Sequence, residues 1–584
     1  MDIKHILTDI TAAAFEACGY ERKFGEVSFS SRPDLCRFQC NGSMSAAKQY
    51  KKAPIAIATE IVEIIKKEPL FKEVTAVMPG FINIDLTDEY IAEVINSMDA
   101  DERLLLPLLE QKTIVVDYGG ANIAKPLHVG HLRSAVIGES LYRIAKFLGN
   151  NVIGDAHLGD WGLQMGLVFA EIESRMPKLV FFKEDYVKSD DEKCPVSIDE
   201  LSEIYPTASK KSKVDADFAA RAAAMTAELQ NGRKGYIALW ESIREISVED
   251  LKANYGNLNV NFDYWYGESG AAPYIPKVIN ILKDKKLIFE SDGAMVVDVS
   301  LPEDKEPMPP MIIQKSNGAD IYGTTDLGTI QQRAEDYSAD EIWYVTDNRQ
   351  MLHFKQVFRC AALAGISENI KLGHYWIGTM NGKDGKPYKT RDGGVMRLSD
   401  MIDTLTESSY RKLCESSEDM DEKEKRDTAR IVGVGALKFG DMINHRTKDY
   451  IFDMDRFLAS DGKTGPYLQY CAVRIKSILK KAKESNMDFG VILSAETDSE
   501  RDLMQILLTV SDTLIRAYDD RAPNCICESL FNIASVFNKF YLENKILSCP
   551  DEARRGSWLS LIRLTLKTME IMLTLVGIDI PDRM

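Results

Sequence analysis

The hydrophobic and polar positions along the chain change their period several times. Residues 55–67 place apolar side chains at helical spacing, whereas residues 81–86 (FINIDL) alternate like a half-buried strand. Residues 113–117 (TIVVD) form a short continuous apolar run, which is typical of a strand covered on both faces of a parallel sheet. These patterns predict an N-terminal region that mixes helix and strand, followed by a domain built on a parallel sheet.

A βαβ unit is predicted to begin with the apolar run at 113–117. A loop rich in glycine, asparagine and proline comes next, then a helix over about 129–148 and a second apolar strand within NVIGDAHLG, residues 151–159. Strand, helix and strand in this order suit a Rossmann-type sheet. We therefore expect an α/β fold in this part of the chain.

The remaining pattern divides the chain into three predicted domains. Residues from about 170 to 300 are charged and mostly helical in pattern, with turn signals at Pro195 and Pro206. We interpret them as an insertion, because sheet-like runs resume after them with DIYGTTDL and EIWYVTD. From about 455 onward the pattern is helical, which predicts a bundle. The predicted domains are an α+β domain over 1–110, the Rossmann-type domain over 111–454 with its insertion, and an all-α domain over 455–584.

Length and charge narrow the possible functions. At 584 residues the chain is too long for one hydrophobic core and is expected to form about three or four domains. The net charge of −17 argues against a protein that binds nucleic acid through overall positive charge. Residues 462–486 nevertheless hold six basic side chains against one acid. Alone, such a run is more typical of a solvated helix face than of a binding site.

No targeting segment is predicted. The first residues lack the basic and then apolar pattern of a secretory signal. The most apolar late stretch is interrupted by Arg563, Lys567 and Glu570, so it is interpreted as an amphipathic core helix and not as a membrane span. We expect a cytoplasmic protein without membrane contact.

The ten cysteines are scattered along the chain. The close pairs, Cys36/Cys40 and Cys525/Cys527, do not have the spacing of zinc knuckles. We expect reduced, mostly packed thiols and no metal ion held by the protein.

Two of only seven histidines lie three residues apart, in NIAKPLHVGH at residues 122–131. The loop after the first strand of a Rossmann-type sheet lies where ligands bind, and the next helix points its N-terminus there, which attracts phosphate. Imidazole donors aimed at developing phosphate charge contribute about 3 kcal/mol each in comparable oxyanion sites. Gly130 between the histidines removes a Cβ that would block a flat adenine ring. On the spacing alone, a pair of helix-capping histidines is an equal alternative.

The surrounding blocks carry a resemblance to a known family. HVGH is one instance of the HIGH signature of class I aminoacyl-tRNA synthetases, and VDYGGANIAKPLHVGHLRSAVIGESLYRIAKFLG resembles the version in arginyl-tRNA synthetases. DAHLGDWGLQMG, IYGTTDL, DNRQMLHFKQVF, KDGKPYKTRDGG and DYIFDMDRFLASDGKTGPYLQYCAVRI are similar to blocks that follow in the same order. With RFQCNGSMSAAK and PGFINI before them and IPDRM after them, the resemblance covers nearly the whole chain.

The resemblance implies a Rossmann-type class I catalytic domain, an α+β N-terminal domain that binds tRNA and an all-α anticodon-binding bundle. It also implies a two-step reaction. The arginine carboxylate attacks the α-phosphate of ATP to give arginyl-adenylate and pyrophosphate, and the 3′-terminal ribose of tRNA(Arg) then takes the arginyl group. The implied partners are L-arginine, ATP with Mg²⁺ as co-substrate, and tRNA(Arg), and a monomer is the usual state.

The resemblance also implies roles at the ATP site. His128 and His131 match the HIGH histidines that meet the ATP phosphates, and Gly130 would admit the adenine. The second signature is YKTRDGG, residues 388–394, in which Lys389 and Arg391 are present but a second lysine is missing. In such cases a lysine before the HIGH box is thought to substitute, and Lys125 occupies that place. A solvated basic turn is the alternative for this stretch.

An arginine site must hold a planar guanidinium, which carboxylates in a fork geometry bind best. Asp117 and Asp326 match the acidic positions of the family, although many members have glutamate at the first of them. Tyr322, Asn122 and Gln350 match further arginine-binding positions, with Asn122 and His128 nearer the α-amino and carboxylate end. For Asp326 the alternative is a helix N-cap.

For tRNA the resemblance singles out two surfaces. In the N-terminal domain the segment with Phe38, Gln39 and Asn41 is a weak candidate. In the helical domain the basic run at 462–486 becomes a stronger candidate for a surface that binds phosphate. Tyr467 and Tyr470 are placed to stack on unpaired bases unless they belong to the core. Arg474 and Lys476 are the basic candidates in that run.

Two other functions stay open on the sequence. The first is a class I synthetase for another amino acid, such as cysteine, but two carboxylates beside a thiol would go unpaired. The second is a tRNA-binding or regulatory protein that has lost catalysis, which the incomplete second signature leaves open. The presence of His128, Gly130, His131 and Lys125 argues against such a loss.

Overall fold

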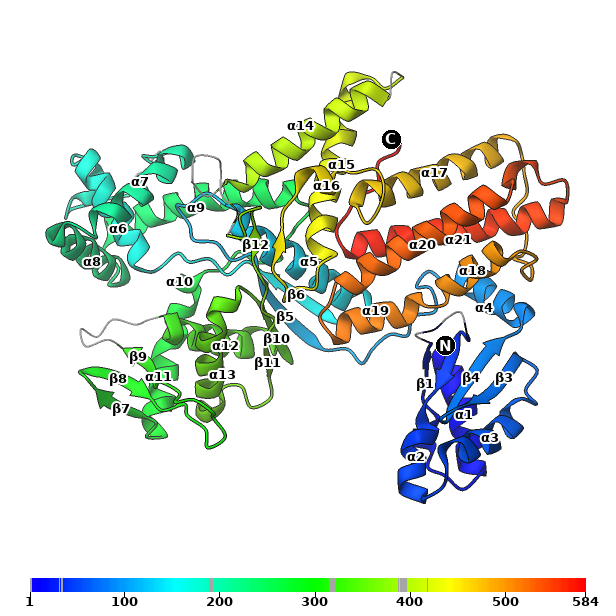
Figure 1. Cartoon of the computed structure of the whole chain (residues 1–584). Helices are drawn as coiled ribbons and strands as arrows, with labels where there is room; N and C mark the ends of the chain where they lie inside the picture. The colour runs from blue at the N-terminus through cyan, green and yellow to red at the C-terminus, as the bar shows by residue number, and fades with distance from the viewer. Residues whose placement is uncertain are drawn as a thin grey trace. The chain divides into compact units, whose positions relative to one another are not determined.

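The computed structural model describes residues 3–30, 32, 35–188, 193–314, 322–386, 388, 396–416 and 419–584. The chain forms two compact units. Unit 1 comprises residues 1–109, 459–575 and 579–584, and unit 2 comprises residues 110–458 and 576–578. The stretches near both ends of the sequence, blue and orange to red in Figure 1, therefore belong to the same unit.

Unit 2 is built on a four-stranded parallel sheet. Its strands are β5 (Thr113–Tyr118), β6 (Asn151–Asp155), β10 (Glu341–Val345) and β11 (Lys371–His374). They lie in the order β11–β10–β5–β6 and all pairs are parallel. The strands predicted at TIVVD, NVIGD and EIWYV are confirmed. Because the chain passes from β5 to β6 on one side and later to β10 on the other, the carboxyl ends of β5 and β10 flank a topological switch point.

Helices cover this sheet and complete its core. The turn η2 (Val129–His131) leads from the loop after β5 into α5 (Leu132–Phe147), and α12 (Tyr322–Tyr337), η5 (Asn348–Gln350) and α13 (Met351–Ala364) flank β10 along the chain. Buried Leu327 and Ile330 of α12 join Val115 of β5 and Ile342 of β10 in one hydrophobic cluster. Such apolar burial stabilises by roughly 1.5–3 kcal/mol for each large side chain.

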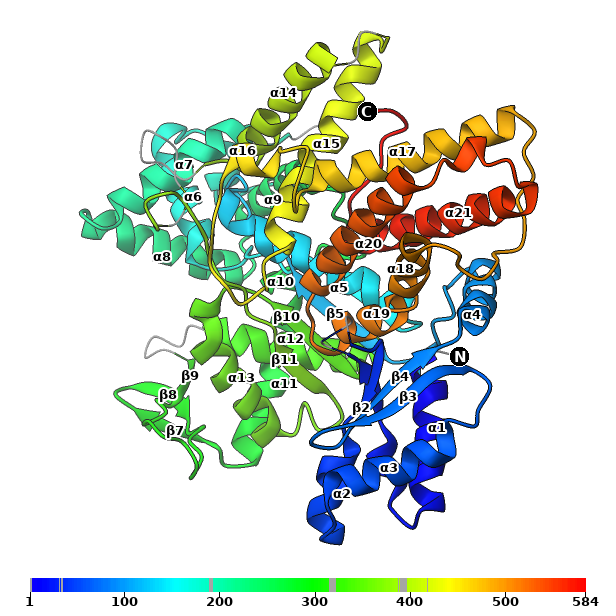
Figure 2. The same cartoon turned by 45° about the vertical axis from the view of Figure 1, so that its right-hand side comes forward.

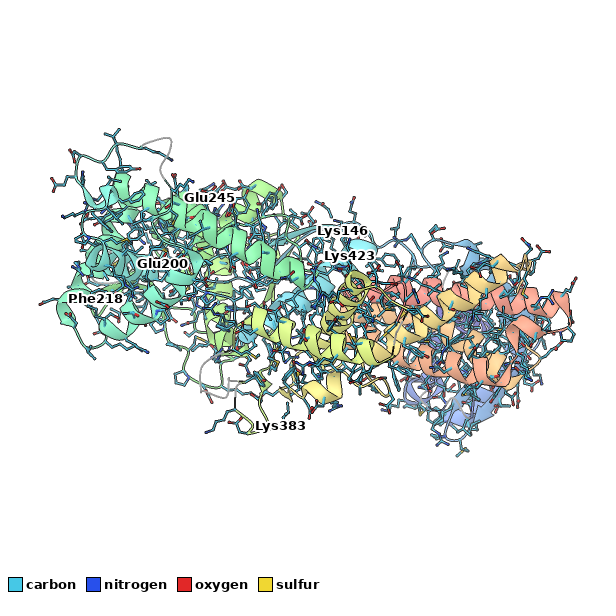
Figure 3. The ribbon with its side chains drawn as sticks, turned by 90° about the horizontal axis from the view of Figure 1, so that it is seen from above. Lys146, Glu200, Phe218, Glu245, Lys383 and Lys423 are labelled. Carbon is cyan, nitrogen blue, oxygen red and sulfur yellow. The ribbon has the colours of Figure 1, made fainter. Side chains whose placement is uncertain are left out.

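The predicted insertion is helical in its first part. Its elements are α6 (Leu163–Arg175), η3 (Val180–Phe182), α7 (Ile198–Lys211), α8 (Ala216–Gln230) and α9 (Lys234–Asn257). Figure 3 labels Glu200, Phe218 and Glu245 on α7, α8 and α9. Glu200 closes a capping box with Ser197 at the start of α7. The turn signal assigned to Pro206 was wrong, because this proline lies inside α7.

Strands appear earlier than the sequence pattern predicted. After α10 (Glu268–Ala271), η4 (Ala272–Tyr274) and α11 (Ile275–Asp284) come the antiparallel strands β7 (Ile288–Ser291), β8 (Ala294–Val297) and β9 (Met311–Gln314). The sheet-like run predicted at DIYGTTDL was wrong: from Tyr322 onward it forms the start of α12, and its first two residues lie outside the described residues. Packing of Leu327 on the sheet core outweighs the low helix propensity of the glycine and threonines.

The rest of unit 2 follows α13 and β11. Its elements are β12 (Met380–Asn381), α14 (Leu398–Ser416), α15 (Glu422–Met442), β13 (Tyr450–Ile451) and α16 (Met454–Phe457), with β12 and β13 paired in parallel. A buried ion pair joins α5 to α15, because Arg133 Nε lies 2.9 Å from a carboxylate oxygen of Asp441. The helix that starts at the HVGH turn is thereby fixed to α15.

The N-terminal part of unit 1 is an antiparallel sheet with helices. Its elements are α1 (Ile3–Ala17), η1 (Arg22–Gly25), β1 (Val27–Phe29), β2 (Phe38–Cys40), α2 (Gly42–Tyr50), α3 (Pro54–Ile65), β3 (Phe71–Val77), β4 (Phe81–Leu86) and α4 (Asp88–Ala100), with strand order β1–β2–β4–β3. The strand predicted at FINIDL and the helix predicted at 55–67 are confirmed, and every second residue of β4 is buried.

The C-terminal part of unit 1 is a helical bundle. Its elements are α17 (Gly465–Glu484), α18 (Asp498–Leu507), α19 (Val510–Asp519), α20 (Asn524–Glu543), η6 (Ile546–Ser548) and α21 (Glu552–Leu575). Helices α17, α20 and α21 lie side by side (Figure 2). Within the described ranges, every helix is too short or too polar to span a bilayer.

Candidate active site

A cavity of about 810 Å³ opens at the carboxyl ends of β5 and β10, beside the topological switch point. The parallel register brings Tyr344, Asp117 and Asp155 side by side on β10, β5 and β6. Tyr344 and Asp117 both line the cavity, as do the HVGH turn and the first turn of α12. All of these elements belong to unit 2.

The two histidines of the HVGH turn hold each other in place through the backbone. The Nδ1 atom of His128 accepts a hydrogen bond from the Gly130 N–H at 3.0 Å, and the Nδ1 atom of His131 accepts one from the His128 N–H at 3.1 Å. The two rings lie 3.9 Å apart between centroids. Because both Nδ1 atoms are acceptors, the ring proton of each neutral imidazole is on Nε2. The capping role and the ligand-binding role are therefore compatible, because they use different nitrogens.

Both imidazoles are neutral at physiological pH. Burial lowers the pKa of His131 to about 3, with the neighbouring His128 adding to the effect. Burial, followed by the positive charge of Lys125, also lowers the pKa of His128. The pair therefore offers hydrogen-bond donors and not positive charges.

The structure shows why residue 130 is a glycine, which the sequence alone did not reveal. A Cβ at this position would lie 2.8 Å from both Cε1 and Nδ1 of His128. Any other residue would therefore displace the ring that accepts the Gly130 N–H. The prediction that Gly130 admits an adenine ring stays a prediction.

Asp117 lies in the cavity wall, and its carboxylate is already paired; burial raises its pKa, although the charge of Arg333 acts in the opposite direction. One Nη atom of Arg333, on α12, lies 2.7 Å from Asp117 Oδ2 and 2.6 Å from Asp155 Oδ2. Burial alone would lower the pKa of Arg333, yet the carboxylates and Tyr344 raise it well above its usual value, so the guanidinium is charged. That Asp117 contacts substrate arginine stays a prediction.

The same carboxylates, with His157, are close enough together to suggest a metal site. A metal ion does not fit there, because the buried Arg333 guanidinium already lies between the two carboxylates. His157 lines the cavity and both of its ring nitrogens are buried without a hydrogen-bond partner among the described residues.

The other predicted arginine-binding residues line the same cavity: Asn122, Tyr322, Asp326 and Gln350. The N-cap alternative for Asp326 was wrong, because this residue lies one turn inside α12. Its carboxylate lies 2.5 Å from Nε2 of His353 on α13. The Tyr322 side chain is 63% exposed and so is free to cover a ligand.

Of the basic residues predicted at the ATP end, the structure describes Lys125. The Nζ atom of Lys125 lies 3.9 Å from the centre of the Tyr205 ring on α7, a cation–π contact. Lys389 and Arg391 lie outside the described residues. The residues on either side are near the site: Tyr388 lines the cavity, and the Val129 N–H donates to the Met396 carbonyl at 3.1 Å.

The structure corrects one predicted tRNA contact. Phe38 is only 1% exposed in the core of the N-terminal sheet, so it does not reach a bound RNA. Gln39 is partly buried and donates to Asn83 on β4. Asn41 is exposed at the start of α2. An alternating strand pattern around Phe38 was the signal for its burial.

The candidates on α17 form a surface cluster with α20. The Arg474 guanidinium lies 4.7 Å from the Tyr470 ring and 5.6 Å from the Tyr541 ring, and it donates to Asn538. Tyr470 is 44% exposed, whereas Tyr467 is partly buried and accepts a hydrogen bond from Asn538. Lys476 is 3.6 Å from Glu570.

Sequence reasoning missed Glu268, which also lines the cavity. Burial, followed by the negative charges of Asp160 and Asp326, raises its pKa to about 8. Glu268 is the only charged residue in YWYGESG, residues 264–270, a segment otherwise composed of aromatic and small residues. That contrast was the available signal.

The parallel sheet, the cavity at its switch point and the HVGH turn define the catalytic domain of a class I aminoacyl-tRNA synthetase. Three family profiles match successive parts of the chain: "Arginyl tRNA synthetase N terminal domain" at residues 1–86, "tRNA synthetases class I (R), catalytic domain" at 93–454 and "DALR anticodon binding domain" at 468–584. The chain belongs to the arginyl-tRNA synthetase family and is an arginine–tRNA ligase of class I.

Similar proteins agree over the full length. The chain is 49% identical to the arginine–tRNA ligase of Alkaliphilus oremlandii, covering 98% of this chain and 97% of that protein. It is 47% identical to the arginine–tRNA ligase of Agathobacter rectalis, covering 99% of each. The arginyl-tRNA synthetase structure of Thermus thermophilus shares the fold with a TM-score of 0.81 at 21% identity, covering 100% of both chains. The family reaction uses ATP, arginine and tRNA(Arg).

Proposed function

We propose that the cavity at the ends of β5 and β10 carries out both steps of arginine–tRNA ligation. In the first step an oxygen of the arginine carboxylate bonds to the α-phosphorus of ATP, and the bond to the bridging oxygen breaks to release pyrophosphate. In the second step the 2′-hydroxyl of the terminal ribose attacks the arginyl carbonyl, and AMP leaves with the bonding electron pair. The observation that carries the proposal is the pair of neutral imidazoles whose Nε2–H groups are left for a ligand.

The ATP end of the cavity is assigned to the HVGH turn. His128 and His131 donate to phosphate oxygens as negative charge develops, and the amino end of α5 adds its partial positive charge. Lys125 contributes charge nearby, since it already lowers the pKa of His128. Lys389 and Arg391 are assigned to the departing pyrophosphate on the resemblance of YKTRDGG to the second class I signature. Mg²⁺ is proposed to enter with the ATP phosphates, without a protein ligand.

The arginine end is assigned to α12 and its neighbours. Asp326 is proposed to bind the guanidinium with Tyr322 beside it, while Asn122 and Gln350 hold the α-amino and carboxylate groups. Asp117 is proposed to form the floor of this site, with its charge shared with Arg333. The carboxylates suit a cation and would be left unpaired by a neutral amino acid.

The tRNA surface is assigned to unit 1. Tyr470, Arg474 and Tyr541 form an exposed aromatic and basic cluster that suits stacking on unpaired bases. Lys476 and the other lysines of α17 supply phosphate contacts. We further propose three domains, 1–110, 111–454 and 455–584, in a monomeric enzyme of the cytoplasm, where charged tRNA is used.

The test is ATP–pyrophosphate exchange with each of the twenty amino acids, with and without tRNA(Arg). Exchange is expected with arginine only, and only when tRNA is present, as the family resemblance implies. Exchange with cysteine, or none with arginine and tRNA, would overturn the proposal.

Histidine variants test the assignment of the ATP end. In His128→Asn and His131→Asn the amide oxygen replaces the accepting Nδ1, but the Nε2–H donor is lost. Each change is expected to lower kcat of exchange about 10²–10³-fold with little change in the KM for arginine. His5→Asn, at an exposed position of α1, is the control and should leave kcat unchanged. If either active-site variant keeps more than about a third of kcat, the donor role is wrong.

A further inference from the structure

The ammonium group of Lys125 is held by the ring of Tyr205, on helix α7 of the insertion. The Nζ atom lies 3.9 Å from the centre of that ring, and both side chains are partly buried. Within the described residues, this ammonium group has no carboxylate at ion-pair distance, and the Tyr205 hydroxyl has no hydrogen-bond partner. The face of the ring is therefore the contact that fixes the end of the Lys125 side chain.

The backbone before Lys125 is fixed as well. Ala124 has a φ of 61°, in the left-handed region that residues with a Cβ rarely adopt. Its N–H donates at 3.1 Å to the hydroxyl of Ser247, which is buried on helix α9 of the insertion. The Ile123 N–H donates to the Gly159 carbonyl at 3.1 Å. Such a backbone conformation persists where the surrounding structure imposes it, so Lys125 leaves the loop at a defined point.

Helix α7 also contacts the segment that follows the second signature. One Nη atom of Arg397 donates to the Ser202 hydroxyl at 2.9 Å, and the other lies 3.5 Å from the Asp199 carboxylate. The backbone of Arg397 forms an antiparallel bridge with His128. Ser202 and Tyr205 are three residues apart and share one face of α7. That face therefore contacts both segments that the resemblance assigns to the ATP phosphates.

Lys125 acts on the HVGH turn from beside the cavity. Burial lowers the pKa of both His128 and His131, and the positive charge of Lys125 adds to the effect in each. Lys125 is nevertheless not one of the described residues that line the cavity. A lysine has a long, flexible stem and loses much conformational entropy when it is immobilised. The position of its charge therefore depends on the group that holds the ammonium end.

We propose that Tyr205 is a positioning residue for adenylate formation, whose ring holds the ammonium group of Lys125 beside the HVGH turn, where its charge is available to the ATP phosphates. This inference rests on the role proposed above for Lys125. A ring suits the task better than a carboxylate does. A carboxylate would neutralise the charge that the phosphates need, whereas an aromatic ring attracts an ammonium group through its quadrupole and leaves the net charge unchanged.

The size of the expected effect follows from the contact. A partly desolvated cation–π contact changes an equilibrium about 5–20-fold. Without the ring, Lys125 would spend most of the time at other positions that its flexible stem allows. The fraction of enzyme with the charge in place, and with it kcat, should fall by that factor. Arginine binding should not change, because neither Lys125 nor Tyr205 is assigned to the arginine end.

The first experiment compares Tyr205→Leu with Tyr205→Phe in tRNA-dependent pyrophosphate exchange. Y205L keeps an apolar side chain without a ring and should lower kcat about 5–20-fold, with the KM for arginine within about twofold. Y205F keeps the ring and should retain kcat within about twofold. Tyr410→Leu is the matched control. It removes a tyrosine of α14 whose ring centre lies 4.4 Å from the Arg426 guanidinium, outside the set of residues that line the cavity, and it should leave kcat unchanged.

A double-mutant cycle with Lys125→Met shows whether Tyr205 acts through Lys125. K125M alone should lower kcat of exchange about 100-fold. Adding Y205L to K125M should lower kcat no more than about twofold further, because the ring then has no ammonium group to hold. A merely structural role of Tyr205 would give losses that multiply, and that outcome would overturn the inference.

A third series does not depend on removing the ring. Phenylalanines that carry successively more fluorine atoms at position 205 keep nearly the same shape while the negative face of the ring weakens. The kcat of exchange should fall stepwise along this series, and the melting temperature should stay within about 2 °C. An unchanged kcat along the series would contradict the inference even if Y205L failed to fold.

The variants also separate this inference from the proposed function. If K125M keeps more than about a third of kcat, the role proposed for Lys125 is wrong and the inference fails with it. If K125M loses activity and Y205L does not, the role of Lys125 stands and the inference alone is overturned. A higher kcat in Y205L would show that the ring withholds Lys125 from ATP, which also overturns it.

Discussion

Two acidic pairs line or adjoin the same cavity and differ in whether the fold supplies a buried guanidinium. Asp117 and Asp155, at the ends of β5 and β6, share the buried guanidinium of Arg333. Asp326 and Glu268, on α12 and α10, have no such partner in the described part of the chain, and the pKa of Glu268 is raised to about 8. Acidic residues at one cavity are therefore paired with a buried guanidinium in one place and lack one in the other.

The difference has opposite consequences for stability. Burial raises the pKa of Asp117 even beside Arg333, and removing that guanidinium would leave two buried carboxylates without a cation, which is strongly destabilising. Carboxylates that face each other without a guanidinium repel, and, after burial, the negative charges of Asp160 and Asp326 accordingly raise the pKa of Glu268. Four substitutions distinguish the two acidic pairs.

Arg333→Met should produce the largest loss of stability. It leaves Asp117 and Asp155 buried without their cation, which costs about 3–5 kcal/mol in the free energy of unfolding. Thermal unfolding followed by tryptophan fluorescence reports mainly on unit 2, which holds five of the six tryptophans. Arg349→Met is the control: its side chain is 85% exposed beside Asp347, and it should cost less than about 1 kcal/mol. Equal losses would refute the structural role of Arg333.

Asp326→Asn should have the largest effect on substrate use. Loss of a charged partner of the guanidinium is expected to lower kcat/KM for arginine about 30–150-fold, or about 2–3 kcal/mol, with little change in the melting temperature. Asp336→Asn, an exposed position on the same helix, should leave kcat/KM unchanged. A decrease below threefold in D326N would show that the guanidinium binds elsewhere.

Asp117→Asn should affect stability more than substrate use. Arg333 would retain only Asp155, so a loss of about 1–2 kcal/mol in unfolding free energy is expected. The KM for arginine should rise less than about fivefold. A rise in this KM as large as that in D326N would show that Asp117 binds the guanidinium. Steady-state kinetics of the two variants, measured side by side, decide between these outcomes.

Glu268→Gln should give the smallest effect, a gain in stability at high pH. The folded-state pKa of Glu268, about 8, lies above that of glutamate in an unfolded chain. Its favourable contribution is therefore complete below about pH 4.5 and is lost as the pH rises through 8. Relative to the unmodified enzyme, E268Q should be more stable by about 1–2 kcal/mol at pH 9 and equally stable at pH 5. Melting curves at both pH values, without arginine, test this, and a loss at pH 9 would contradict it.

Local patterns in the amino-acid sequence predicted much of the framework. Continuous apolar runs predicted β5, β6 and β10, and the alternating run predicted β4, because period and burial are local properties of a strand. The HVGH turn was placed correctly at the amino end of α5, since both histidines and their backbone partners lie within four consecutive residues. The order of the matched blocks also led to the correct family.

Which charged side chains pair with one another depends on the folded chain. Arg333 pairs with Asp117 across 216 positions of sequence, and no local pattern indicates that partner. Glu268 lines the cavity because hydrogen bonds to Asp160 and Leu158 hold its loop in place. Phe38 does not reach a bound RNA because its side chain is buried under the N-terminal sheet. The start of α12, predicted as a strand, became a helix through packing on the sheet. The free energies of buried charges depend on neighbours that folding brings together, whereas strand period and turn capping depend on neighbours that are adjacent in the chain.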